Sequence, residues 1–94
     1  MNKIQVLIKV EEDDFTTTTR VICASHNIDK LEERFREEVQ KEKQFESENE
    51  IEYDTVEETH NSFEAYNEGR HAESSIAIYI TDAEVIWNFW HSIW

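Results

Sequence analysis

The sequence predicts an α+β fold in a single domain over residues 1–94, with a small antiparallel sheet of about three to five strands packed against one main amphipathic helix at about 28–44. Three patterns lead to this prediction. Apolar and polar residues alternate near the N-terminus, apolar residues recur at three- and four-residue spacing in the middle of the chain, and isoleucines alternate around Ile78. A chain of 94 residues has room for one thin core.

The first two strands are predicted at 3–10 and 15–24. In the first, apolar residues alternate with polar ones, as is typical of a half-buried strand. These are Ile4, Val6, Ile8 and Val10. In the second, the alternation puts one set on a single face, namely Phe15, Thr17, Thr19, Val21 and Cys23. Because only the acidic residues 11–14 separate the two runs, we expect an antiparallel hairpin.

The helix at about 28–44 has a clear start and a clear apolar side. Asn27 can cap its N-terminus, and Asp29 suits the positive end of the helix dipole. The apolar stripe consists of Ile28, Leu31, Phe35 and Val39. The outer face is expected to carry the pairs Glu32–Arg36 and Glu37–Lys41, together with Glu33, Glu38 and Glu42. We therefore expect the stripe to close over the hairpin while these charges face water.

The segment from residue 46 to residue 69 is compatible with a strand followed by a helix. A strand at 50–55 would turn Ile51 and Tyr53 inward and point the intervening acids outward. A second short helix at about 56–68 would begin at a capping box in residues 55–58 and stop at Gly69.

The C-terminal third contains one more predicted strand, at 75–81. Its isoleucines alternate with Ala77 and Tyr79, so both faces are apolar, and we expect it in the centre of the sheet. Residues 82–94 fit either a helix opened by a capping box at Thr81 or a strand at 85–90. The strand is favoured because Val, Ile, Trp and Phe prefer strands and Asp82 suits a turn.

The composition excludes several classes of protein. With Gly69 as the only glycine, a P-loop and a dinucleotide-binding fingerprint are both impossible. One cysteine, Cys23, rules out an intrachain disulfide and is compatible with a reducing compartment. No apolar run approaches the ~20 residues of a membrane span. We therefore expect a soluble cytoplasmic domain that does not associate with a membrane.

The charge is strongly negative and unevenly distributed. The chain has 22 acidic and 9 basic residues, for a formal net charge of −13. From Glu46 to Glu68 there are acids but no lysine or arginine. The acids of this block are Glu46, Glu48, Glu50, Glu52, Asp54, Glu57, Glu58, Glu64 and Glu68. Direct binding of nucleic acid is disfavoured, because both molecules would be negative.

The acidic block predicts a partner-binding face. Carboxylates held on an ordered surface can occupy the basic groove of a nucleic-acid-binding protein in place of phosphates. The residues expected to form this face are Glu46, Glu48, Glu50, Glu52, Asp54, Glu57, Glu64 and Glu68. The leading hypothesis is thus a non-enzymatic inhibitor or modulator of a basic protein. The competing interpretation is a solvated face that only keeps the protein soluble.

A second candidate surface lies near the C-terminus. Its apolar residues are Trp87, Phe89, Trp90, Ile93 and Trp94. Packing in the core would account for Phe89 and one tryptophan, whereas an oligomer or partner interface would account for the whole set. The alternative function is therefore a small structural or regulatory module that uses this cluster, as a homodimer, with the acids serving solubility.

Catalytic and metal chemistry have weak support in the sequence. Cys23 and His26 have the spacing of half a zinc site, which His60 or His71 could complete. A small buried cysteine and surface histidines explain these residues more simply. No particular carboxylate is set apart as a general acid or base. The sequence therefore predicts no enzymatic activity, no catalytic residues, no metal site and no cofactor.

In size, acidity and scarcity of glycine and proline, the chain resembles the small proteins with which phages inhibit the host machinery that handles nucleic acids. These include anti-restriction, glycosylase-inhibiting and anti-CRISPR proteins. The resemblance rests on size and charge and transfers no site residue. It implies a host nucleic-acid-binding protein as the class of partner.

Overall fold

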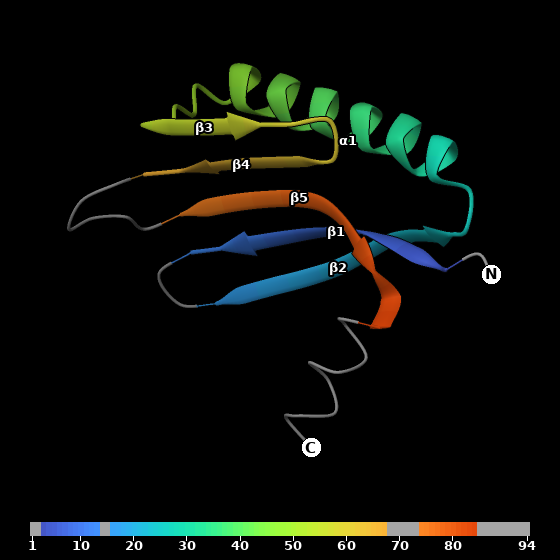
Figure 1. Ribbon diagram of the computed structural model, residues 1–94. Helices are drawn as coiled ribbons and strands as arrows, with labels where there is room; N and C mark the ends of the chain where they lie inside the picture. Colours follow the sequence, from blue (N-terminus) through green and yellow to red (C-terminus); the bar gives the residue numbers. More distant parts are fainter. Residues whose placement is uncertain (1–2, 14–15, 68–73, 85–94) are drawn as a thin grey trace.

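The computed structural model describes residues 3–13, 16–67 and 74–84. It confirms the α+β class, with a five-stranded antiparallel sheet and one helix of 21 residues packed against it (Figure 1). The elements are β1 (Gln5–Glu12), β2 (Thr17–Ser25), α1 (Ile28–Glu48), β3 (Thr55–Glu58), β4 (Ser62–Tyr66) and β5 (Ser75–Asp82). No helix in the described part of the chain is both long and apolar enough to span a bilayer.

The sheet has the strand order β2-β1-β5-β4-β3. The predicted N-terminal hairpin is confirmed, because β1 and β2 pair antiparallel. The central position predicted for the isoleucine-rich strand is confirmed as well, since β5 pairs with β1 on one side and with β4 on the other. Strands from the two ends of the chain thus lie side by side in the middle of the sheet (Figure 1).

The helix α1 covers one face of the sheet and supplies half of the core. The Asn27 side chain accepts a hydrogen bond from the backbone N–H of Lys30, so the predicted cap is confirmed. The core consists of Leu7, Leu31, Phe35, Val39, Phe63, Ala65 and Ile78. The predicted apolar stripe is thus buried, except for Ile28, which is exposed. The helix continues to Glu48, beyond the expected end at residue 44.

Strand β1 is buried on both faces. Leu7 is fully buried beneath α1, and Val6 and Ile8, on the opposite face, are buried too. The prediction of a half-buried strand is therefore wrong, because residues on both faces of β1 are buried.

Strand β2 departs from regular alternation at a bulge. Ile8 pairs with Val21 and Leu7 pairs with Cys23, so Ile22 is the extra residue. Val21 and Cys23 consequently lie on opposite faces, and the prediction that they share one is wrong. Ile22 and Cys23 both pack against the core.

The two elements predicted between residues 50 and 68 are both wrong. A hairpin of β3 and β4 takes the place of the second helix, and residues 51–54 form a connection in place of a strand. One tertiary and one local effect favour the hairpin. Phe63 and Ala65 alternate into the core, and the Thr59 hydroxyl accepts a hydrogen bond from the Ser62 N–H in the turn.

Several predictions concern residues outside the described part of the chain. They include the strand at 85–90, all but the first three residues of the helical alternative for 82–94, and the whole aromatic cluster of Trp87, Phe89, Trp90, Ile93 and Trp94. The stop at Gly69 and the acid at Glu68 also lie there. The turn expected at Asp82 is not found, because Thr81 and Asp82 still pair with Val6 and Gln5 of β1.

Replacing Phe35 by Ala should lower the free energy of unfolding by about 3–5 kcal/mol, because its ring is the largest on the buried side of α1. Phe45→Ala is the matched control on the same helix, since Phe45 is 53% exposed and Phe35 only 2%. It should cost about 1 kcal/mol or less. Urea unfolding followed by circular dichroism measures both changes, and equal losses would contradict the assigned packing.

Candidate partner-binding surface

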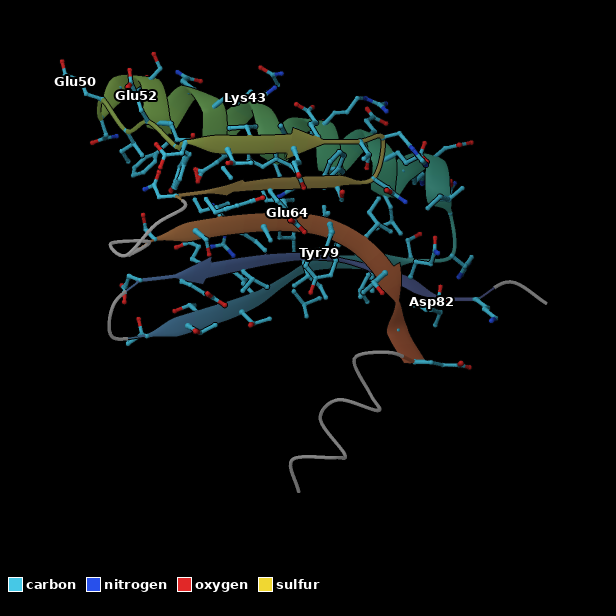
Figure 2. The ribbon with its side chains drawn as sticks, turned by 60° about the vertical axis from the view of Figure 1, so that its left-hand side comes forward. Lys43, Glu50, Glu52, Glu64, Tyr79 and Asp82 are labelled. Carbon is cyan, nitrogen blue, oxygen red and sulfur yellow. The ribbon has the colours of Figure 1, made fainter. Side chains whose placement is uncertain are left out.

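The acids that follow α1 gather at one end of the molecule. Glu48 is the last residue of the helix, and Glu50, Glu52 and Asp54 lie in the connection to β3; all are exposed. Figure 2 shows Glu50 and Glu52 at this end, with Asp82 at the opposite end. These side chains therefore point into solvent, as the prediction of an acidic face requires.

The backbone holds this end in a defined shape. The N–H of Ile51 donates to the Glu46 carbonyl at 2.8 Å, and the N–H of Glu50 donates to the Ser47 carbonyl at 3.4 Å. These two bonds form a Schellman motif, which requires a left-handed residue, usually glycine, just after the helix cap. Here that residue is Glu50, with φ of 56°. A glutamate in this conformation costs about 1–2 kcal/mol.

The helix dipole adds a second cost. The last turn of α1 has no basic residue, and Glu48 lies at the negative end of the helix. Negative side chains are unfavourable there, typically by 0.3–1 kcal/mol. The local electrostatics therefore oppose the placement of acids at this terminus.

Two further acids face each other across the β3–β4 hairpin. Glu57 pairs directly with Glu64, and both are exposed on the side of the sheet opposite α1, since the neighbouring Phe63 and Ala65 point toward the helix. Like charges directly opposite in a sheet are destabilising. Glu58 is different, because it faces α1 and binds the ammonium of Lys43 at 2.8 Å.

The acids that follow α1 and the pair Glu57–Glu64 lie next to each other along the chain. Asp54 and Glu57 are three positions apart in the sequence, which is about 10 Å of extended chain. We define the acidic surface as Glu48, Glu50, Glu52, Asp54, Glu57 and Glu64. None of these carboxylates forms an ion pair with a cation in the described residues. Among the described residues, the surface therefore has no cation that compensates its negative charge.

The β1–β2 hairpin extends this negative region in a way that sequence reasoning missed. A hollow of about 200 Å³ is lined by Glu12 and Asp13 from the hairpin and by Tyr53 from the connection after α1. The acids of the hairpin thus border the acidic surface. They are about 40 positions away in the sequence, so no local pattern could join them to it.

Of the two remaining predicted acids, Glu46 does not belong to the surface. Glu46 is partly buried, and desolvation raises the pKa of its carboxyl group, while the ammonium groups of Lys43 and Lys9 partly offset that shift. One of its oxygens, Oε2, has no hydrogen-bond partner in the described part of the structure. Glu68 lies outside the described residues.

A buried carboxylate beneath α1 was also missed. Glu42 was expected on the outer face but is 3% exposed, with its Oε1 3.9 Å from the Lys9 ammonium. Desolvation raises the pKa of Glu42 to about 6, partly opposed by Lys9 and reinforced by Glu46. The sequence feature that could have revealed this pair is Lys9. It shares the helix-facing side of β1 with Leu7, so its ammonium needs an acid from the helix that covers it.

Glu38 was likewise expected to face water and is buried. Its Oε1 lies 3.0 Å from the Arg34 guanidinium and 3.6 Å from the Lys41 ammonium. Arg34 and Lys41 of α1 thus neutralise Glu38, and the outer-face pairs expected from the sequence are not among the ion pairs of the described residues.

The cations collect away from the acidic surface. A groove of about 660 Å³ lies between α1 and the β1–β2 hairpin, and its basic lining residues are Lys9, Arg20, Arg34 and Lys41. Lys43 forms an ion pair with Glu58, and its ammonium lies 5.9 Å from the centroid of the Phe63 ring. Lysines and arginines of the described residues are therefore paired with acids outside the acidic surface, or, like Arg20, form no ion pair.

No group of three or more His, Cys, Asp or Glu side chains in the described ranges is placed to hold a metal ion. Comparisons with known proteins found no matching family model, no matching curated protein and no matching solved structure.

Replacing Glu50 by Gly should raise the free energy of unfolding by about 1 kcal/mol, because glycine adopts the left-handed conformation without a steric cost. Glu52→Gly removes the same charge where φ is not positive, and should be neutral or destabilising. Thermal unfolding of both variants tests this cost, and equal effects would contradict it.

Replacing Glu42 by Gln should stabilise the protein in a pH-dependent manner. Between pH 4.5 and about 6, the unfolded chain releases the Glu42 proton before the folded protein does, so the wild type loses stability as the pH rises. The variant lacks this loss, and its advantage over wild type should grow by about 2 kcal/mol across that window. The measurement is urea unfolding at a series of pH values.

The matched control is Glu37→Gln, which makes the same change at an exposed position of α1. Its stability should follow the wild-type curve. A Glu42→Gln advantage that is constant with pH would contradict the assigned burial.

Proposed function

We propose that this protein is a non-enzymatic inhibitor or modulator that binds a basic, nucleic-acid-binding protein through the acidic surface. The observation that carries the proposal is the absence of any ion pair between the six carboxylates of this surface and a cation of the described residues. A purely solubilising charge could be placed anywhere. Four of the six acids instead occupy positions where folding opposes them, namely Glu48, Glu50, Glu57 and Glu64.

Three such positions support this interpretation. Glu50 adopts a left-handed conformation, Glu48 ends a helix without a compensating cation, and Glu57 faces Glu64 across two strands. The electrostatic costs at Glu48 and at the Glu57–Glu64 pair would be offset when lysine and arginine side chains of a partner approach. Stability given up at a surface is consistent with a binding role.

The chemistry of the partner follows from the charge. An uncompensated negative surface steers a basic protein toward it, and the complex competes with the nucleic acid for the same lysines and arginines. The resemblance in size and charge to phage inhibitors makes a host enzyme that acts on nucleic acids the first partner class to test. The binding needs no cofactor and no metal ion.

The test compares two triple variants of equal charge. Glu50→Gln, Glu52→Gln and Asp54→Asn together neutralise the exposed connection, whereas Glu32→Gln, Glu33→Gln and Glu37→Gln neutralise the same number of acids on α1. We expect the first variant to bind its partner roughly 3- to 150-fold more weakly, because each of the three charge contacts is worth ~0.2–1 kcal/mol. The second variant should bind as the wild type does.

The measurement is affinity capture on the immobilised protein from host lysate, at low and high salt and with duplex DNA as competitor. Captured proteins should bind nucleic acid and be released by salt and by DNA. Capture that resists salt and DNA, or that the two triple variants reduce equally, would contradict the proposal.

A further inference from the structure

The sheet has two edges that differ in their protection. The edge strand β3 has four residues and carries Glu57 and Glu58, and short, charged strands discourage pairing with other chains. The other edge strand, β2, has nine residues, of which Arg20 is the only charged one. Residues 17–21 of β2 are all exposed and are mostly β-branched. No strand of the described residues pairs with the outer side of β2, so in this part of the structure the edge is open to another strand.

The hydrogen-bond pattern shows which groups of β2 are free. The N–H of Asp13 donates to the Thr16 carbonyl at 2.9 Å at the start of the ladder. Because bonded and non-bonded pairs alternate between antiparallel strands, the backbone groups of Thr17, Thr19 and Val21 point away from β1. The bulge at Ile22 ends this regular stretch, so Thr19 is its midpoint.

We propose that two copies of this chain form a dimer in which their β2 strands pair antiparallel. A two-fold axis passes through Thr19, and the two sheets join into one. In this register Thr19 lies opposite Thr19 of the second copy. The outward N–H of each Thr19 donates a hydrogen bond to the outward C=O of the other. Thr17 lies opposite Val21, which is 53% exposed in the single chain. Cross-strand pairs of β-branched residues are favourable, and the symmetry forms each of these contacts twice.

Charge complementarity favours a second copy as the occupant. The same register sets Arg20 opposite Thr18 of the second copy, and Thr18 pairs with Glu11 within its own sheet. Arg20 is therefore two strand spacings, about 9.6 Å between Cα atoms, from Glu11 of the other chain, which their long side chains can span. Arg20 forms no ion pair within the described part of one chain.

The rest of the molecule is compatible with a closed dimer. The strand β3, which carries part of the acidic surface, lies four strand spacings from β2, or roughly 19 Å, beyond the Debye length of about 8 Å at physiological salt. The outer edges of the dimer would be the two charged β3 strands, which stop further strand addition. This dimer does not depend on the proposed function.

The first test uses Thr19→Pro. Proline fits an edge strand where the N–H points outward, so the sheet should persist while the central bonds between the two chains are lost. Thr19→Val keeps the N–H and is the matched control. Sedimentation and light scattering should find a dimer for the wild type and Thr19→Val, and a monomer with an unchanged circular dichroism spectrum for Thr19→Pro.

The second test uses a charge swap and does not rely on proline. Arg20→Glu and Glu11→Arg should each weaken the dimer about tenfold, and the two together should restore it. A monomeric wild type at all concentrations, open-ended polymers, a dimer that survives Thr19→Pro, or single charge reversals without effect would each overturn the proposal. A dimer formed through another surface would be recognised by its survival of Thr19→Pro.

Discussion

The packing of the α1 stripe onto the middle of the sheet is the constraint on which the other features depend. Phe35 and its neighbours contact Leu7, Phe63 and Ile78, which come from three adjacent strands. This contact sets the rotation of the helix about its axis. The rotation in turn buries Glu38 and decides which acids must be neutralised within the fold and which remain in water.

The consequence is a separation of charge. Most of the cations near α1 are engaged by the acids that packing has buried, as Lys9 is by Glu42 and Arg34 is by Glu38. The acids after the helix are left without counterions in the described structure, and a left-handed Glu50 holds their connection in shape. A strongly negative chain thereby becomes a molecule with a charged end and, at β2, an almost uncharged edge.

Several elements could be predicted from the sequence, because their signals are local. The hairpin of β1 and β2, the cap at Asn27 and the central strand β5 all follow from period and turn chemistry within one segment. The β3–β4 hairpin could not. Its residues satisfy a helical pattern equally well, and the choice is made by the open edge of β5, to which only a strand can bond.

By itself the sequence determined that an acidic block exists and that one amphipathic helix covers a sheet, since both are properties of composition and short-range period. The tertiary structure alone decided which acids are free. Glu46 and Glu42 turn inward, whereas Glu57 and Glu64 meet across a hairpin that local patterns did not predict. The physical reason is that burial and pairing depend on side chains from other elements, and their approach is set only when the core closes.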